Sequence, residues 1–537
     1  MNLGRLNAAS VVYLAFVDIN NDGWLDLFFA TQDDGNHYIA NQSGSFDPRS
    51  IMPLPSPINA QTAAAAFADV NKDGRLDIYN GNWALGPFAS GRGEPISARN
   101  QMLYSNGDQF EVHTESDLGA PTLSTLFSDL NGDGILDLFV GNDFRYRDRF
   151  LFGNAEGEFF APANLKSTFP HTTWTTMSVT SADLDNDLQP ELFLAQISRG
   201  QDSRPFFRQT INLNELDQHV IAEEAESARE LSDRRFQGKE LTDRHSRRSV
   251  LLNQIEDPDL RADAVTMVVV HEIAQSGDPD LLAALPTEAT EMRKRIARFK
   301  TTRNRLSPEE MSRELVQIEN HNALFKGDEA NNFRDIAIPS GLGVTGWTWN
   351  AKFADLDLDG WQDLFLATGW EISKVRESNR YYRNNYGKGF VQETKEAGLT
   401  DYHATSSYAY CDFDQDGDFD LITVPNSAPV RVWRNNAQNN HALTVELRDE
   451  LGNTFGIGGK VIIAYGPEGS QQQIREIKAS GGFHSADAPI AHFGLSEFPT
   501  ITSLKIIWPD GEHTTIDATL EGNSRYVITR ARVKAEG

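Results

Sequence analysis

The sequence predicts a mainly β protein: a β-propeller of repeated four-stranded blades, interrupted by a helical insertion and followed by a second β domain. Three observations predict this fold. A short acidic loop recurs six times in 537 residues, apolar runs of strand length flank the loops, and a hairpin-like element follows most of them. A strand-containing repeat of about 40–60 residues is typical of propeller blades.

The acidic loops share one spacing of oxygen-bearing side chains. Asp stands at positions one and five, Asp or Asn at three, and Asp or Glu at nine, and five loops have Gly at six. The first aspartates of successive loops are 51, 60, 54, 172 and 57 residues apart. Such oxygens, with a backbone carbonyl from position seven, suit a hard cation such as Ca²⁺, and Gly permits the sharp turn. The residues predicted to bind calcium are Asp18, Asn20, Asp22, Trp24, Asp26, Asp69, Asn71, Asp73, Arg75, Asp77, Asp129, Asn131, Asp133, Ile135, Asp137, Asp183, Asp185, Asp187, Glu191, Asp355, Asp357, Asp359, Trp361, Asp363, Asp412, Asp414, Asp416, Asp418 and Asp420.

Two other interpretations of the loops are weaker. An EF-hand begins similarly but ends with Glu at position twelve and lies between helices, whereas runs such as Val11–Val17 and Leu25–Ala30 predict strands on both sides. Clusters of Asp, Asn and Gly also mark solvated turns that bind no ion, but six loops with one spacing favour a shared ligand. The fourth loop deviates, since Leu188 replaces the glycine and Glu191 the last aspartate, so we expect a distorted or empty site.

A second recurring element predicts the other two strands of each blade. It is a hairpin with Asn or Gly in the turn and a second strand that starts at Phe. Because the hairpin of the fourth loop is delayed until His321, residues 198–320 are expected to be an insertion between the second and third strands of one blade. The propeller is then expected in residues 1–197 and 321–440. The hairpins begin at Asn36, Asn100, Asp148, His321 and Asn379.

The insertion is predicted to be helical. Leu213, Leu216 and Val220 have helical spacing, and Ser307–Glu310 offers an N-cap followed by Pro and Glu. The acidic loops join first to second strands, whereas the insertion joins a second to a third strand. We therefore expect the insertion on the propeller face opposite the acidic loops.

Residues 441–537 are predicted to form a separate β-sandwich-like domain, because the acidic repeat stops and short strand-like runs with Gly and Pro-Asp-Gly turns begin. The predicted strands are Leu443–Arg448, Lys460–Tyr465, Gln473–Lys478, Ser503–Trp508 and Tyr526–Arg530.

The acidic loops resemble FG-GAP or VCBS-type repeats, which are known from integrin α-subunit propellers and bacterial secreted proteins. Four segments resemble the ASPIC/UnbV domain: Phe455–Val461, Gly481–Ser485, His492–Leu495 and Trp508–Gly511. Repeats followed by this domain are similar to the cartilage acidic protein 1 family. The resemblance covers about residues 10–200 and 321–530. It implies a calcium-binding propeller, usually seven-bladed, in a secreted or surface protein with no established catalytic activity. A seventh blade would need a degenerate loop or residues before Met1.

The acidity of the chain lies mostly outside the insertion. The net charge is −28, and residues 201–330 hold 19 Lys and Arg against 25 Asp and Glu, which leaves −22 for the remainder. Six calcium ions would offset about half of that charge, whereas without metal the carboxylates repel one another. This charge argues against binding to the phosphate backbone of nucleic acids.

The compartment is predicted from the expected metal. No run is long and apolar enough to span a bilayer, and the N-terminal residues show no signal peptide. Cys411 is the only cysteine, which excludes a disulfide framework and favours a buried structural role. Weak, multiple calcium sites suit millimolar calcium, so we expect an extracellular, cell-surface or periplasmic protein whose leader is absent.

The sequence contains no convincing catalytic constellation. His271-Glu272 lacks the second histidine of a zinc protease motif, and no Gly-x-Ser-x-Gly or phosphate-binding loop is present. Trp174 and Trp347 precede acidic loops at similar distances and are expected to pack between blades; a platform for a sugar is the alternative. His484 and His492 are expected to be structural.

Two functions from different classes remain open. The first is a non-enzymatic binding or assembly protein in which calcium stiffens the blades and the helical insertion docks a protein partner. The second is a hydrolase or lyase that acts on polysaccharide in the propeller mouth, which rests on analogy with the fold. His, Tyr and carboxylate side chains that converge on one pocket would favour the second.

Overall fold

The computed structural model describes most of the chain outside residues 199–317. The described residues are 11–31, 34–56, 61–83, 99–107, 109–115, 120–143, 147–162, 168–198, 318–319, 321–328, 330–369, 377–437 and 440–531. Within them the protein is mainly β, as predicted, and the helical element is one 3-10 turn, η4 (Pro467–Gly469). The predicted helical insertion, including its docking role and its position relative to the acidic loops, falls almost entirely outside these residues and stays a prediction.

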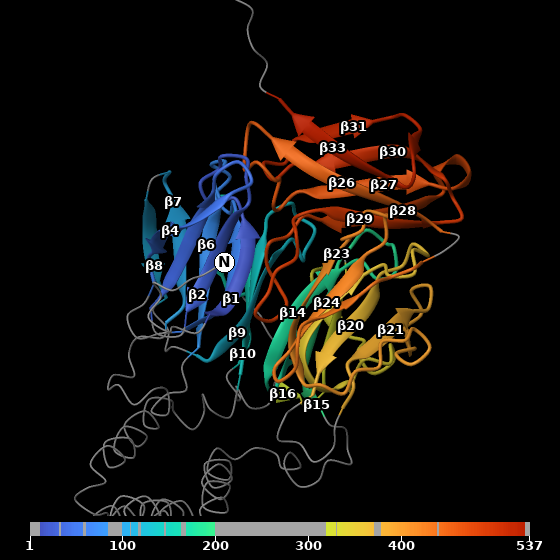
Figure 1. Ribbon diagram of the computed structural model, residues 1–537, viewed down its shortest axis with the longest axis horizontal. Helices are drawn as coiled ribbons and strands as arrows, with labels where there is room; N and C mark the ends of the chain where they lie inside the picture. Colours follow the sequence, from blue (N-terminus) through green and yellow to red (C-terminus); the bar gives the residue numbers. More distant parts are fainter. Residues whose placement is uncertain are drawn as a thin grey trace, which may run out of the picture. The chain divides into compact units, whose positions relative to one another are not determined.

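Antiparallel meanders account for most strands before residue 434 (Figure 1). The first is β1 (Val11–Val17), β2 (Asp26–Thr31), β3 (Asn36–Asn41) and β4 (Phe46–Leu54). The second is β5 (Gln61–Ala68), β6 (Asp77–Trp83), β7 (Gln101–Ser105) and β8 (Phe110–Thr114). The third is β9 (Thr122–Ser128), β10 (Asp137–Asn142), β11 (Arg149–Gly153) and β12 (Phe159–Phe160).

Three more meanders follow along the chain. The fourth is β14 (Thr176–Ala182), β15 (Glu191–Ser198), β17 (Ala323–Gly327) and β18 (Phe333–Asp335). The fifth is β19 (Gly346–Ala354), β20 (Asp363–Thr368), β21 (Arg380–Asn384) and β22 (Phe390–Gln392), and the sixth is β23 (Thr405–Cys411), β24 (Asp420–Pro425) and β25 (Arg431–Trp433). In the five four-stranded meanders the last strand starts at Phe, as the hairpin pattern predicts. β15 pairs with β17, so the strands on either side of residues 199–317 in the sequence are adjacent in one sheet.

The second strands of several meanders are buried on both faces because neighbouring strands cover them. All six residues of β2 are buried, as are those of β10 and β20, which is expected when sheets pack face to face. The first strands of successive meanders contact one another, from β1 to β5, β9, β14, β19 and β23. Burial of these strands is the main favourable contribution to folding.

Two further sheets form from residue 441 onward. The first sheet is β29 (Ala491–Ser496), β26 (His441–Asp449) and β33 (Ser524–Arg530). The second is β28 (Gln471–Glu476), β27 (Lys460–Tyr465), β30 (Thr500–Ile507) and β31 (His513–Ile516), with β32 (Leu520–Glu521) beside β30. Leu443, Val461 and Leu504 are fully buried in their shared core. The sequence did not predict β29 or β31, because Gly494 interrupts the pattern of one and the other has four residues.

Residues 479–487, which we name the central segment, contact the first strand of every meander. Ala479, Gly482 and Ser485 form isolated β-bridges to Phe67, Val179 and Leu14, respectively. The N–H of Gly481 donates to Thr125 O at 2.8 Å, Asn350 Nδ2 donates to Phe483 O at 3.0 Å, and the N–H of Tyr410 donates to Asp487 Oδ1 at 3.1 Å. The central segment therefore ties strands from six meanders to the C-terminal sheets.

Gly482 is required in the central segment by its backbone and its neighbours. Its φ is +73°, which favours glycine, and a Cβ there would lie 3.0 Å from Asn350 Oδ1 and 3.2 Å from Ser485 O.

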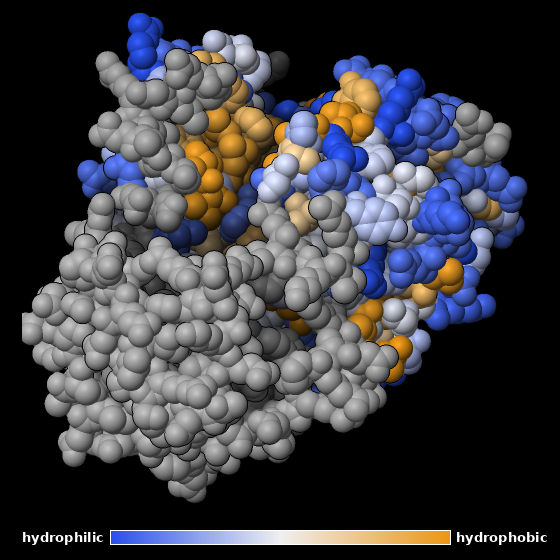
Figure 2. Space-filling view, turned by 60° about the horizontal axis from the view of Figure 1, so that its bottom comes forward, coloured by the Kyte–Doolittle hydropathy of each residue, from blue (hydrophilic) through white to orange (hydrophobic). Residues whose placement is uncertain are grey.

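The described part of the surface in Figure 2 is largely hydrophilic, with hydrophobic residues gathered in separate patches. No helix among the described residues has the length and apolar character needed to cross a bilayer.

Candidate metal centres

The six acidic loops connect the first and second strands of the six meanders, and all six have the same backbone arrangement. In the first loop, Asp18 accepts the N–H groups of Asp22 at 3.0 Å and Gly23 at 2.9 Å, while Asp26 accepts that of Ile19 at 3.0 Å. The N–H of Trp24 at position seven donates to Asp22 at 2.9 Å. The other five loops repeat these bonds. Side chains at positions one, five and nine thus shape the loop before any ion is considered.

The carboxylate at position nine also attaches the loop to the third strand. Asp77 Oδ1 accepts the N–H of Ser105 at 2.8 Å, and Asp363 Oδ1 accepts that of Asn384 at 2.8 Å. The same bond forms at Asp26, Asp137 and Asp420. The position-nine residues therefore have a structural role in addition to the predicted ligand role.

Burial raises the pKa of several loop carboxylates. Burial is the main cause at Asp69, where the pKa rises to about 6, and at Asp77 and Asp359, where it rises to about 7, with neighbouring carboxylates adding to the shift. The ionised form of each group is therefore disfavoured, and a bound divalent cation would reverse that preference.

Several loop oxygens have no hydrogen-bond donor in the fold. The Oδ1 atoms of Asp185, Asp414 and Asp418 are buried without such a partner, whereas Asp414 Oδ2 has Arg434 Nε 2.7 Å away. Carboxylate oxygens of Asp183, Asp185 and Glu191 lie within 4.8 Å of one another, as do those of Asp355, Asp357 and Asp359, and those of Asp412, Asp414 and Asp420. Convergent oxygen ligands with unsatisfied lone pairs fit a hard cation such as Ca²⁺.

The fourth loop differs because a lysine reaches into it. Lys326 Nζ lies 2.5 Å from Asp185 Oδ2, 2.8 Å from Asp187 Oδ2 and 2.9 Å from Glu191 Oε1. The backbone is nevertheless that of the other loops, since Leu188 adopts a φ of +68° where Gly23 has +91°. An ammonium thus occupies the position that the oxygen spacing offers to a cation, which gives a physical reason for the altered sequence of this loop.

Strand register places other basic residues at the same position. In each meander, the residue after the position-nine residue pairs with a residue of the third strand, and the next residue of the chain marks the position of Lys326. This position is Ala40, Tyr104 and Phe152 in the first three meanders, and Lys326, Arg383 and Arg434 in the last three. Arg434 Nε lies 2.7 Å from Asp414 Oδ2, whereas Arg383 pairs with Glu393 at 3.1 Å. The first three loops have no basic side chain at this position.

The acidic loops also contact the C-terminal sheets. The contacts come from the first, third, fifth and sixth loops, and three of the four C-terminal residues that provide them belong to the segments that resemble ASPIC/UnbV. They are Thr454 N to Asn21 Oδ1 (2.9 Å), Lys460 Nζ to Asp129 Oδ2 (2.6 Å), Gly494 N to Asp355 Oδ2 (3.1 Å) and His492 Nε2 to Gly417 O (2.9 Å). The conformation of the loops is therefore linked to the position of the C-terminal sheets.

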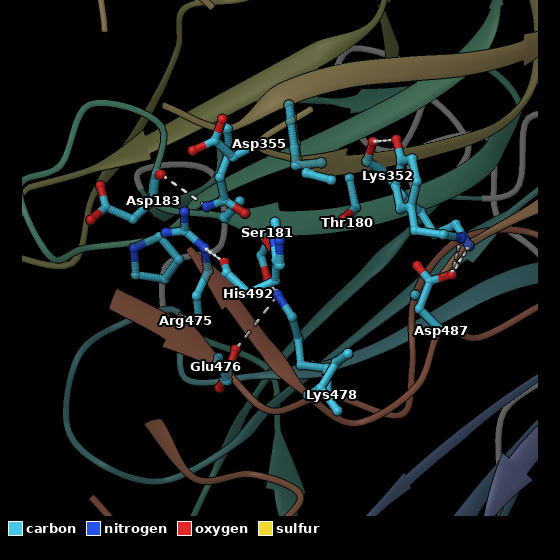
Figure 3. Close-up of a pocket in the computed structure, with 18 of the residues that line it drawn as sticks. Thr180, Ser181, Asp183, Lys352, Asp355, Arg475, Glu476, Lys478, Asp487 and His492 are labelled. Carbon is cyan, nitrogen blue, oxygen red and sulfur yellow. Dashed lines mark hydrogen bonds and ion pairs between the residues drawn. The ribbon is translucent and has the colours of Figure 1, made fainter. Parts of the chain in front are cut away.

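A polar cavity of about 160 Å³ lies between the fourth and fifth loops and the C-terminal residues 474–492 (Figure 3). Its charged groups are mostly paired: Lys352 Nζ is 2.7 Å from Asp487, Lys478 Nζ is 3.8 Å from Glu476, and Arg475 Nε donates to His492 O at 3.0 Å. Burial lowers the pKa of Lys352 and of Lys478. These cations hold the C-terminal residues against β14 and β19.

The other residues singled out from the sequence have packing contacts. Trp174 is buried, and its N–H donates to Gln196 Oε1 at 3.1 Å. His492 stacks on Phe419 at 4.0 Å, and burial lowers its pKa to about 4. Cys411, expected to be buried, is half-buried at the end of β23, since it precedes the exposed side of the sixth loop. His271 and Glu272 lie outside the described residues.

Known families match two parts of the chain. Residues 449–535 match the family described as ASPIC and UnbV, and residues 18–79 and 129–194 match the FG-GAP-like repeat. These matches confirm the resemblance seen in the loops and in the C-terminal segments. The second match covers the first, second, third and fourth acidic loops.

Similar curated proteins are named cartilage acidic protein 1. The Homo sapiens protein is 28% identical over 186 residues, 34% of this chain and 27% of its own length. The Mus musculus protein is 28% identical over 186 residues, 34% and 28% of the two lengths, and the Xenopus tropicalis protein is 31% identical over 182 residues, 33% and 27%. The alignment thus spans about a quarter of these relatives. A chain of the Photorhabdus luminescens Tc holotoxin pore covers 86% of this chain and 15% of its own at 13% identity, but its TM-score of 0.32 supports no argument.

Proposed function

We propose that this chain is a non-enzymatic, calcium-stabilised binding or assembly protein of the extracellular, cell-surface or periplasmic space. The observation that carries the proposal is the backbone arrangement shared by six loops, together with carboxylate oxygens that converge in the last three loops and include, at Asp414 Oδ1, a buried oxygen without a hydrogen-bond donor. Calcium neutralises these groups and fixes the loops against the C-terminal sheets. The matches to FG-GAP-like and ASPIC/UnbV families support the compartment.

The meanders are proposed to be blades of a propeller. Successive contacts between first strands support this arrangement, and the central segment lies where those strands meet. The blade number is proposed to be seven, because Val11, Leu14 and Phe16 on β1 are 40–46% exposed whereas all residues of β9 and β14 are buried. A further blade would cover β1, and an experimental structure that shows β1 packed directly against the sixth meander would contradict it.

Calcium binding is tested by denaturation and by counting ions. The wild-type chain is unfolded with urea in EGTA and in millimolar CaCl₂, and bound calcium is measured by equilibrium dialysis. We expect calcium to raise the free energy of unfolding, and magnesium at the same concentration to do so less, because Mg²⁺ gives up its water shell reluctantly. An unchanged urea midpoint together with no bound calcium would contradict the proposal.

Partner binding is proposed for residues 198–320, which the meander itself does not need. A matched pair of bait proteins tests this role: the full chain and a variant in which a short Gly-Ser linker replaces residues 205–318. Both baits are used in calcium for recovery of partners from the native source. Recovery of the same partners by both baits would end the docking hypothesis, whereas loss of specific partners with an unchanged calcium response would support it.

Catalysis on polysaccharide, the alternative from the sequence, gains no support from the cavity. Tyr410 and His492 line it, but the Tyr410 hydroxyl donates to Lys352 O at 3.1 Å and the His492 ring is engaged with Gly417 O. The described cations of the cavity are engaged with carboxylates or carbonyls. We therefore do not propose a catalytic role for this cavity.

A further inference from the structure

A cluster of two histidines and one aspartate lies apart from the acidic loops. His171 precedes β13 (Thr172–Thr173), His321 follows β16 (Ile318–Glu319), and Asp335 ends β18. β13 and β16 pair in parallel, with Thr172 opposite Ile318. This pairing brings together two histidines that are 150 residues apart in the sequence. They lie next to the point where the chain re-enters the fourth meander after the insertion.

The ring nitrogens of both histidines converge on one carboxylate oxygen. His171 Nε2 is 3.0 Å and His321 Nε2 is 2.9 Å from Asp335 Oδ2, and the side chains are 12–21% exposed. Suitable atoms of all three residues lie within 4.8 Å of one another. In a tetrahedral zinc site with bonds of 2.0–2.1 Å, ligand atoms are about 3.3 Å apart. The two histidine–aspartate separations therefore need to widen by only a few tenths of an ångström to hold an ion.

The groups behind Asp335 and His171 orient these two side chains as in metal sites. Asp335 Oδ1 accepts the N–H of Leu324 at 3.0 Å and that of Ala337 at 2.9 Å, which leaves Oδ2 for the histidines. His171 Nδ1 lies 3.4 Å from Thr172 O, on the side of the ring away from Asp335. A metal-bound histidine commonly directs its second nitrogen to a backbone carbonyl. In the tautomer with the proton on Nδ1, the Nε2 lone pair faces Asp335, and a cation between them would relieve the repulsion.

We propose that His171, His321 and Asp335 bind one zinc ion at the root of the inserted segment. Two imidazole nitrogens and one carboxylate oxygen suit Zn²⁺, whereas the all-oxygen acidic loops suit Ca²⁺. Three protein ligands leave one coordination position for water. The ion would link His321, which follows the inserted segment, to His171 beside β13 and to Asp335 at the end of β18. The site is independent of calcium binding and of the proposed function.

Zinc binding is tested on the full chain in saturating CaCl₂, so that the acidic loops do not compete. Zinc affinity and stoichiometry are measured by competition with a chromogenic chelator for wild type, His171→Gln and His321→Gln. His403→Gln is the matched control, since His403 Nδ1 is 2.7 Å from Asp401 but its neighbour is the Arg431 guanidinium. We expect one zinc ion in wild type and in the control. We expect binding about 100-fold weaker or more in the other two, because even outer groups around a metal contribute 10–100-fold.

A second measurement uses only the wild-type protein, in case a variant fails to fold. Zinc-edge X-ray absorption of the loaded chain should show two imidazole ligands per zinc, and Co²⁺ substitution should give the visible absorption of a tetrahedral site. Full retention of zinc by both histidine variants, or wild-type affinity no better than that of free imidazole, would overturn the proposal. The two histidines would then simply donate N–H groups to Asp335.

Discussion

Replacement of Lys326 by Met tests whether the Lys326 ammonium takes the place of a calcium ion in the fourth loop. Met keeps the apolar length of the side chain and removes the ammonium. Three carboxylates, Asp185, Asp187 and Glu191, then lack this countercharge. Removing one partner of a buried ion pair costs about 3–5 kcal/mol. Because Asp185 and Asp187 are 33% and 43% exposed, we expect the lower end, about 3 kcal/mol, in the absence of calcium.

Calcium should compensate for the lost ammonium. With a dissociation constant of roughly 10⁻⁴ M, about 5 mM calcium stabilises a new site by about 2 kcal/mol. The destabilisation caused by Lys326→Met is therefore expected to fall to about 1 kcal/mol in calcium, and the variant should bind one more calcium ion than wild type. Leu188, already at a φ of +68°, does not prevent this, since the backbone has the loop conformation.

The assay is urea denaturation of both proteins in EGTA and in calcium, with equilibrium dialysis for the ion count. Lys388→Met is the control, because Lys388 is an exposed lysine outside the loops, and its replacement should change stability little under either condition. An equal loss of stability with and without calcium, at an unchanged number of bound ions, would refute the reasoning. Lys326 would then be an ordinary structural ion pair.

Three further predictions follow from described contacts. Asp414→Asn should reduce the calcium-dependent gain in unfolding free energy by about 1–2 kcal/mol, with one ion fewer in dialysis, because Asp414 Oδ1 is a buried oxygen without a donor; an unchanged ion count would contradict this. Burial lowers the pKa of His492 from 6.5 to about 4, so the folded protein favours the neutral imidazole. The free energy of unfolding should therefore fall as the pH drops from 6.5 towards 4, by about 2 kcal/mol at pH 5. Urea midpoints from pH 7.5 to 5 should fall less steeply in His492→Gln, and identical slopes would argue against this histidine. Gly482→Ala should lower the free energy of unfolding, measured with urea, by about 2 kcal/mol or more, because of its positive φ and close neighbours. Gly511→Ala is also at positive φ but has nothing within 4 Å of the added Cβ, and should lower it by about 1 kcal/mol. Equal losses would mean that the central segment is not tightly packed.

Much of the repeat could be predicted because its signals are local. Position-nine aspartates and the flanking apolar runs lie within a few residues of each other, and the strands β2, β6, β10, β20 and β24 begin at that aspartate in the described structure. The Phe at the start of the last strand is equally local. β29 could not be predicted, because its Gly494 N–H donates to the side-chain carboxylate of Asp355, 139 residues earlier, where a Cβ would not fit.

The sequence by itself determined the mainly β class, the six loops and the oxygen spacing that suits calcium, because strand pairing and tight turns depend on neighbouring residues. Only the tertiary structure decided what lies opposite each loop. Lys326 reaches loop four across 135 residues, His171 and His321 meet at Asp335, and the central segment joins first strands that lie far apart along the chain. Such contacts depend on which elements pack together, and no local spacing encodes the identity of a distant neighbour.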